Sequence, residues 1–220
     1  ENNMALDKDI VGSIEFLEVV GLQGSTYLLK GPNGENVKLN QSEMNDDDEL
    51  EVGEEYSFFI YPNRSGELFA TQNMPDITKD KYDFAKVLKT DRDGARIDVG
   101  LPREVLVPWE DLPKVKSLWP QPGDYLLVTL RIDRENHMYG RLASESVVEN
   151  MFTPVHDDNL KNEVIEAKPY RVLRIGSFLL SESGYKIFVH ESERKAEPRL
   201  GESVQVRIIG IGRASCRERV

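Results

Sequence analysis

The chain is built from short runs of apolar residues that alternate with polar ones and end at turns containing glycine. Three times along the sequence, two strand-like runs are followed by a turn, a third run, a variable loop and an apolar run led by glycine. Runs of four to eight residues with this period predict β-strands. A pattern that recurs every 65 to 75 residues or so indicates a tandem array of one small module.

The first copy of the module occupies residues 4–72. Its turn Gly31–Gly34 has the sequence Gly-Pro-Asn-Gly, a strong signal for a chain reversal. An acidic loop, 45–49, separates the third and fourth runs. The strands that we expect in this copy are 10–20, 25–30, 36–39, 56–61 and 67–71.

The second copy occupies residues 76–143 and the third 168–210, and the first strand of the third copy begins near Val164 or Tyr170. In the second, the expected strands are 82–89, 95–99, 105–112, 125–132 and 137–142. In the third, the runs 177–180 and 185–190 flank the turn 181–184, and a Gly-led run follows at 201–209. The sequence therefore predicts an all-β protein with three modules.

Residues 144–167 do not follow the module pattern. Val147, Val148, Met151 and Phe152 fall at helical spacing ahead of Pro154, and Asp157–Asn159 resembles the cap of a second short turn. We expect a short helical linker between the second and third modules.

The last ten residues, 211–220, stand apart from the rest. Their sequence, Ile-Gly-Arg-Ala-Ser-Cys-Arg-Glu-Arg-Val, reads like the translation of a common sequencing-adapter oligonucleotide. We expect this segment to be a non-native tail, and we expect the third module to lack its last strand.

Composition and charge narrow the class of protein. With 39% hydrophobic and 30% charged residues, the chain has the composition of a folded soluble protein. No apolar run approaches the roughly 20 residues that span a bilayer, and the start of the chain has no signal-peptide pattern, so we expect a cytoplasmic protein. The net charge is −11, but residues 4–72 hold 4 Lys/Arg against 14 Asp/Glu, whereas residues 168–210 hold 8 against 5. Only the third module has the charge sign that favours binding to phosphates.

The third module also holds the residues with the clearest chemistry. Phe178 lies on one predicted strand, and Phe188 and His190 lie on the next. Aromatic rings and a histidine on adjacent strands are used to stack unpaired bases. The alternative is a hairpin whose phenylalanines belong to the core. Strict alternation places Phe188 and His190 on one face and Tyr185 on the other, so Tyr185 is the expected core residue.

This hairpin resembles the centre of an S1-type RNA-binding domain, a five-stranded OB barrel. The second and third strands of that family read roughly Gly-Ala-Phe-Val and Gly-Leu-Val-His-Ile-Ser, which Phe178, Val189-His190 and Ser192 match here. The segment 105–112 resembles the same third strand, with Pro108 where the histidine would stand. The resemblance implies tandem S1-like OB barrels joined by the short helical linker.

The whole array, from residue 4 to 210, is similar to the conserved virulence factor B family of bacterial RNA-binding proteins. The most specific stretches are 58–63 and 170–193. Members of that family carry a winged-helix module after the third barrel, which we expect to be absent from this chain. If RNA binding in the family depends on that module, the resemblance implies weak binding here.

The resemblance implies that RNA contacts Phe178, Phe188 and His190, with Arg171, Arg174 and Lys186 neutralising phosphates nearby. In the second module the candidates are Trp109, Arg96, Tyr139 and Arg141. For each basic residue the alternative is a solvated surface charge, and for Trp109 it is a partly buried core position.

Catalytic chemistry finds no support in the sequence. There is no Gly-rich phosphate loop ahead of a helix, no His-Glu-x-x-His motif and no nucleophile elbow. His137, His156 and His190 lie in different segments without metal-ligand spacing, and the single cysteine excludes an internal disulfide. We therefore expect no enzyme activity, no metal, no cofactor and no small-molecule substrate.

Two functions remain for the chain. The first is a non-catalytic bacterial regulator of gene expression or virulence that binds single-stranded RNA by aromatic stacking and phosphate contacts. The alternative is a scaffold that docks transcription, translation or RNA-decay machinery, with the acidic first module meeting a basic protein partner.

Overall fold

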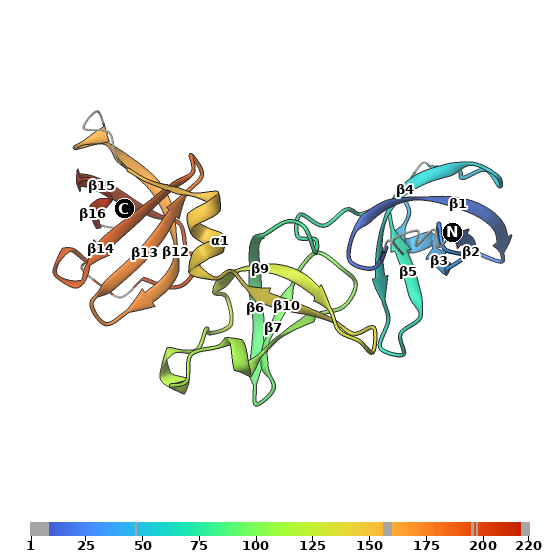
Figure 1. Cartoon of the computed structure of the whole chain (residues 1–220), viewed down its shortest axis with the longest axis horizontal. Helices are drawn as coiled ribbons and strands as arrows, with labels where there is room; N and C mark the ends of the chain where they lie inside the picture. Colours follow the sequence, from blue (N-terminus) through green and yellow to red (C-terminus); the bar gives the residue numbers. More distant parts are fainter. Residues whose placement is uncertain (1–8, 47, 156–159, 195, 197, 217–220) are drawn as a thin grey trace, which may run out of the picture. The chain divides into compact units, whose positions relative to one another are not determined.

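The computed structural model describes residues 9–46, 48–155, 160–194, 196 and 198–216. Within them the chain forms three five-stranded β-barrels in tandem, which are called the first, second and third barrel in chain order (Figure 1). The expected all-β class and the tandem OB-type barrels are confirmed. Each barrel is described by itself.

The first barrel closes in the strand order β1-β2-β3-β5-β4. Its pairings are antiparallel except for the parallel pair β3–β5, which is the connection of an OB-fold. Inward side chains such as Leu29, Val37 and Phe58 fill the interior completely. The strands are β1 (Ile14–Gln23), β2 (Thr26–Lys30), β3 (Asn36–Asn40), β4 (Glu55–Pro62) and β5 (Leu68–Thr71).

The second barrel has the equivalent closed order β10-β8-β7-β6-β9. Strand β9 occupies the same residues as predicted, and it is buried over most of its length. The strands are β6 (Asp83–Asp91), β7 (Gly94–Asp98), β8 (Val105–Pro108), β9 (Tyr125–Ile132) and β10 (Met138–Leu142). The predicted third strand, 105–112, ends early because Trp109–Asp111 turn into a 3₁₀-helix.

The third barrel contains β12 (Val164–Leu173), β13 (Gly176–Ser181), β14 (Tyr185–His190), β15 (Val204–Gly210) and β16 (Arg213–Cys216). Strand β16 pairs with both β15 and β14 and so closes the barrel. The expectation that this barrel lacks its last strand was wrong. Ala214 is buried in the core and the backbone of β16 satisfies the open edges of its neighbours, so a short segment of small side chains suffices. That residues 211–220 are foreign to the natural protein stays a prediction.

The linker is helical only in part. Ser144 accepts a hydrogen bond from the N–H of Val147 and so caps α1 (Glu145–Met151). A two-residue strand, β11 (Thr153–Pro154), follows and pairs with β14. The predicted second turn at Asp157–Asn159 lies outside the described residues.

The boundary predicted at 167/168 falls inside β12, because that strand begins at Val164. Pro169 lies inside this strand, and proline has no N–H to give to a ladder. In the structure a shift of register between Pro169 and Arg171 interrupts the ladder at that point. A bulge of this kind tolerates the proline and lets the strand continue.

Candidate functional site

The outer face of β12, β13 and β14 carries four aromatic side chains in contact, here called the ring row. They are Tyr170, Phe178, Phe188 and His190. The centroids of Phe178 and Phe188 are 5.0 Å apart, and those of Tyr170–Phe178 and Phe188–His190 are each 6.3 Å apart. All four side chains keep some exposure to solvent.

The strand register explains why the rings meet. Phe178 of β13 lies directly opposite Phe188 of β14, and His190 lies opposite Gly176. Side chains alternate between the two faces of a strand, so the intervening Ile187 and Val189 enter the barrel core. The prediction that Phe188 and His190 share a face is confirmed, and Tyr185 packs against the core as expected.

Tyr170 belongs to the ring row although the sequence did not indicate it. The shift of register between Pro169 and Arg171 changes which residues of β12 share a face. Alternation from the buried Ala167 and Pro169 places Tyr170 outward, but only the paired strands show that its ring reaches Phe178 of β13. The signal that was available is the Pro-Tyr pair within an otherwise strand-like run, because proline in a strand often marks a bulge.

Two basic side chains beside the ring row converge on one carboxylate. Lys186 Nζ lies 5.1 Å from the centroid of the Phe178 ring and donates to Glu145 Oε2 over 3.1 Å. Arg171 Nη1 donates to Glu145 Oε1 over 3.0 Å. The Tyr170 hydroxyl lies 3.3 Å from Oε2, so three donors surround the carboxylate.

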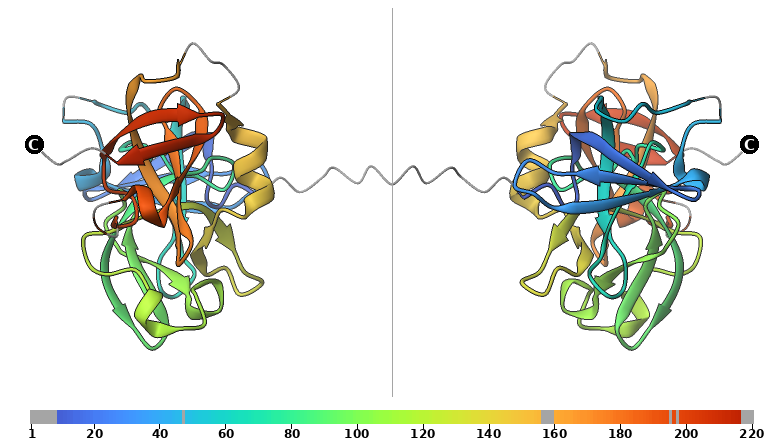
Figure 2. Two further views of the ribbon diagram at one scale, coloured as in Figure 1. Left: turned by 90° about the vertical axis from the view of Figure 1, so that its left-hand side faces the viewer. Right: turned by 90° about the vertical axis from the view of Figure 1, so that its right-hand side faces the viewer.

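Glu145 is the first residue of α1, which lies beside the strands of the third barrel (Figure 2, left). Partial burial of its carboxyl raises the pKa, but the hydrogen bonds and charges of Lys186 and Arg171 together bring the pKa below its ordinary value. Burial, followed by the charge of Glu145, raises the pKa of Tyr170, so its phenol stays protonated and acts as a donor. No local pattern points to Glu145, because its partners are 25 to 41 positions away.

His190 is oriented by the residue two positions later. The backbone N–H of Ser192 donates to Nδ1 over 3.2 Å, and the Ser192 hydroxyl lies 2.8 Å from the same nitrogen. Because Nδ1 accepts from the backbone, the neutral imidazole carries its proton on Nε2. The exposed edge of His190 therefore presents a donor next to the ring row.

Arg174 lies apart from this cluster of donors. It sits in the turn between β12 and β13 and is exposed. The structure thus brings Arg171 and Lys186 to the ring row and leaves Arg174 at one end of the same hairpin.

The second-barrel candidates do not form a comparable row among the contacts of the described residues. Arg96 on β7 and Tyr139 and Arg141 on β10 point outward, and Tyr139 lies opposite Leu106 of β8. Trp109 is 55% exposed just after β8, so it is not a core residue. Leu106 and Pro108 alternate outward on β8, as Phe188 and His190 do on β14, which leaves the second barrel without an aromatic pair at these positions.

The first barrel has no ring row either. Leu28 and Lys38 form the cross-strand pair that corresponds to Phe178 and Phe188. Its tyrosines Tyr27 and Tyr61 are buried, and burial raises the pKa of Tyr61 to about 12.

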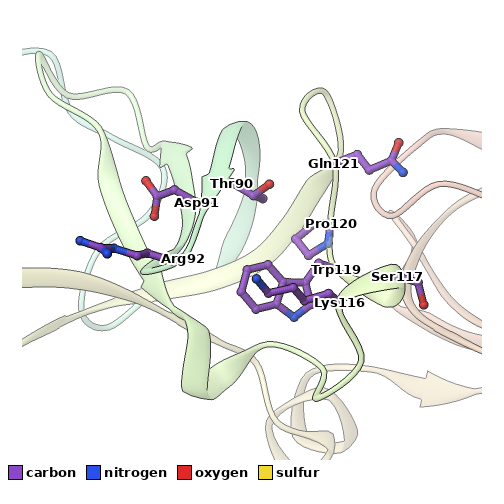
Figure 3. A pocket seen from close by; sticks show the side chains of 8 residues that line it. All are labelled: Thr90, Asp91, Arg92, Lys116, Ser117, Trp119, Pro120 and Gln121. Atoms are coloured by element: carbon purple, nitrogen blue, oxygen red, sulfur yellow. The ribbon is translucent and has the colours of Figure 1, made fainter.

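A shallow depression of about 370 Å³ lies on the second barrel (Figure 3). Lys116 covers the ring of Trp119 there, with Nζ 5.6 Å from the ring centroid, and the indole N–H donates to the carbonyl of Pro113. Both contacts hold Trp119 within its own loop. The depression adds no titratable cluster to the candidate site.

Two kinds of site are not found in the described part of the chain. There, no group of three or more His, Cys, Asp or Glu side chains is placed to hold a metal ion. No helix among the same residues is long and apolar enough to cross a bilayer.

Comparison with protein families gives matches to all three barrels. Residues 11–73 match the model described as S1 domain, 82–141 match the first S1-like domain of CvfB, and 149–216 match the second domain of virulence regulatory factor CvfB. The first two modules therefore match S1 or S1-like models, and the third matches a domain of the same regulatory factor.

Whole-chain relatives and a solved structure give the same picture. The chain is 86% identical over 207 residues to conserved virulence factor B of Staphylococcus haemolyticus, covering 94% of this chain and 69% of the relative. It is 82% identical to the protein of the same name from Staphylococcus epidermidis, over 94% of this chain and 70% of the relative. A crystal structure of a multidomain protein with nucleic acid binding domains from Streptococcus pneumoniae superposes with a TM-score of 0.77 at 27% identity, covering 96% of this chain and 75% of that one.

Proposed function

Because the chain belongs to the conserved virulence factor B family, we propose that it is a non-catalytic, cytoplasmic regulator that binds single-stranded RNA on its third barrel. The ring row is the observation that carries this proposal. The solved relative, described as having nucleic acid binding domains, supports the ligand class.

Base stacking supplies most of the binding energy in this proposal. A base on an aromatic side chain contributes about 1–3 kcal/mol and tolerates any base identity. Phe178, Phe188 and His190 offer three such surfaces along two paired strands. Affinity should therefore depend little on sequence and strongly on the absence of base pairing.

Phosphate contacts supply the remainder. Arg171, Lys186 and Arg174 are the basic side chains on or beside the hairpin of the ring row. Each phosphate neutralised on a single strand contributes about −0.7 to the slope of log K against log salt. Three contacts predict a slope near −2 by the same rule.

The second barrel contributes secondary contacts through Trp109, Arg96, Tyr139 and Arg141. Trp109 is exposed enough to stack on a base. Because this barrel offers no aromatic pair, we expect these contacts to extend the RNA footprint with a smaller effect on affinity.

The test is the affinity of the purified chain for a fluorescein-labelled oligouridine, measured by fluorescence anisotropy. Replacing Phe178 and His190 together with alanine should weaken binding by at least about 10-fold, since two stacking surfaces are lost. The control is Phe16→Ala, which removes a ring that is 71% exposed on the first barrel. Unchanged affinity in the double variant would remove the basis for the proposal.

A second candidate function, a docking scaffold for a basic protein, is favoured by the surface of the first barrel. Ile14, Phe16 and Leu22 on β1 are 43%, 71% and 55% exposed in the module with the largest excess of Asp and Glu. Apolar residues surrounded by acids suit a partner with a basic, amphipathic surface. Partners that stay bound after nuclease treatment and are lost in Phe16→Asp would support the scaffold, while partners that nuclease releases would support RNA.

A further inference from the structure

The carboxylate of Glu145 occupies a position that would suit a phosphate. Three donors from β12 and β14 meet there: Arg171 Nη1 at 3.0 Å, Lys186 Nζ at 3.1 Å and the Tyr170 hydroxyl at 3.3 Å. Arginine, lysine and a phenol are common donors to an anionic oxygen, whether it belongs to a carboxylate or to a phosphate. The cluster is therefore a built anion site that a residue of the same chain fills.

The anion site adjoins the centre of the ring row. Lys186 lies over the Phe178 ring, and Arg171 is the cross-strand neighbour of Phe178 on β12. Tyr170 belongs to both groups, since its ring contacts Phe178 and its hydroxyl reaches the carboxylate. A nucleotide whose base stacks on Phe178 would have its own phosphate next to these donors.

We propose that Arg171, Lys186 and Tyr170 form the phosphate subsite of the ring row, and that Glu145 occupies this subsite until an RNA phosphate displaces it. The inference rests on the proposed function and adds a built-in competitor to it. The affinity for RNA is then lower than the rings and cations alone would give. The size of this reduction depends on how readily α1 moves away with Glu145.

The strength of this competition follows from the exposure of the groups. The side chains of Glu145 and Arg171 are 37% and 48% exposed, while that of Lys186 is 19% exposed. Ion pairs with this much exposure are weak. We therefore expect removal of the Glu145 charge to strengthen RNA binding by about 2-fold to 5-fold.

The neighbouring Glu149 provides a matched control. It lies one turn later on the same helix and is exposed, so Glu149→Gln removes an equal charge while Glu145 keeps its position. Any general effect of lower negative charge on RNA binding appears in both variants. The charge of Glu149 also reaches Tyr170, so only an effect that requires the hydrogen bonds from Arg171 and Lys186 appears in Glu145→Gln alone.

The experiment compares both variants with the parent chain, using labelled oligouridine at several salt concentrations. Glu145→Gln should lower Kd by about 2-fold to 5-fold relative to Glu149→Gln, because the RNA phosphate no longer has to displace a carboxylate from the two cations. Adding Arg171→Ala should abolish most of this gain. Equal affinities in the two glutamine variants, or weaker binding in Glu145→Gln, would overturn the inference.

The experiments also distinguish failure of this inference from failure of the proposed RNA-binding function. If the Phe178/His190 double variant binds RNA as the parent does, the proposed function fails. If that variant loses affinity while the two glutamine variants behave alike, the ring row binds RNA and only the competitor role of Glu145 is wrong.

Discussion

Replacing Gly176 with alanine is the smallest change that should disturb the ring row. Gly176 begins β13 opposite His190, and its φ of +156° lies in a region that side chains rarely adopt. A Cβ at this position would lie 2.4 Å from the carbonyl oxygen of Val189 and 2.6 Å from Cζ of Phe188. The ring of Phe188 can rotate away, but the carbonyl belongs to the paired strand and can only move with it.

The size of the effect follows from these two contacts and the backbone angle. Overpacking of this kind costs about 1–3 kcal/mol. An unfavourable backbone conformation adds about 1 kcal/mol more. A total of about 2–4 kcal/mol corresponds to a change of roughly 30-fold to 1,000-fold in the opening equilibrium of the β13–β14 hairpin.

Hydrogen exchange followed by mass spectrometry measures this opening directly. Peptides covering β13 and β14 should exchange faster in Gly176→Ala by about the same factor, and RNA affinity should fall because Phe188 is displaced. The control is Gly210→Ala in β15 of the same barrel, where an added Cβ meets nothing within 4 Å. If the two variants exchange alike, the account of how the rings are held in place is wrong.

Three further predictions concern the same barrel. The pKa of Glu145 is lowered, so its carboxylate should keep α1 attached as the pH falls through the ordinary Glu value near 4.3, and the attachment should be lost only below that pH. Amide exchange in α1, measured against pH, tests this, and Glu145→Gln should remove the pH dependence. Ala214→Asp should destabilise the third barrel by about 3 kcal/mol or more, because it places an unpaired carboxylate in the core. The control, Arg213→Asp on the exposed side of β16, should change stability by less than about 0.5 kcal/mol. Urea denaturation followed by circular dichroism measures both. Burial raises the pKa of the Cys216 thiol, so maleimide labelling at pH 7 should be slower than for an unstructured cysteine peptide and should accelerate when urea opens the barrel. If Cys216 reacts without urea as fast as the unstructured peptide does, the described β16 is wrong.

The strands were predictable because their signals are local. Turns with glycine, such as 181–184, and alternation along runs such as 185–190 depend on residues within a few positions of each other. The same alternation correctly separated His190 and Phe188 from Tyr185. Nothing beyond the hairpin itself was needed for these assignments.

The closing strand could not be found in this way, and the local pattern left the start of the third copy open between Val164 and Tyr170. Arg213–Cys216 has no strand pattern of its own, and it becomes a strand because the edges of β14 and β15 require partners. Residues 164–167 pair with 204–207, about forty positions later. Such pairings depend on the assembled barrel, and local sequence does not encode them.

The candidate site divides along the same line. Phe178, Phe188 and Lys186 share one hairpin, and the sequence brought them together. Tyr170 joins them at a bulge, and Glu145 joins them from the helix within the linker. The contacts of Tyr170 and Glu145, which show how an anion is held, could therefore be found only from the structure.

Photo-crosslinking tests the central claim most directly. A single-stranded oligonucleotide containing 4-thiouridine is bound to the parent chain, irradiated and digested, and the crosslinked peptides are identified by mass spectrometry. Crosslinks concentrated on β12, β13 and β14, at Tyr170, Phe178, Phe188 or His190, are the predicted result. Crosslinks confined to the first two barrels, or spread evenly over the chain, would contradict RNA binding at the ring row.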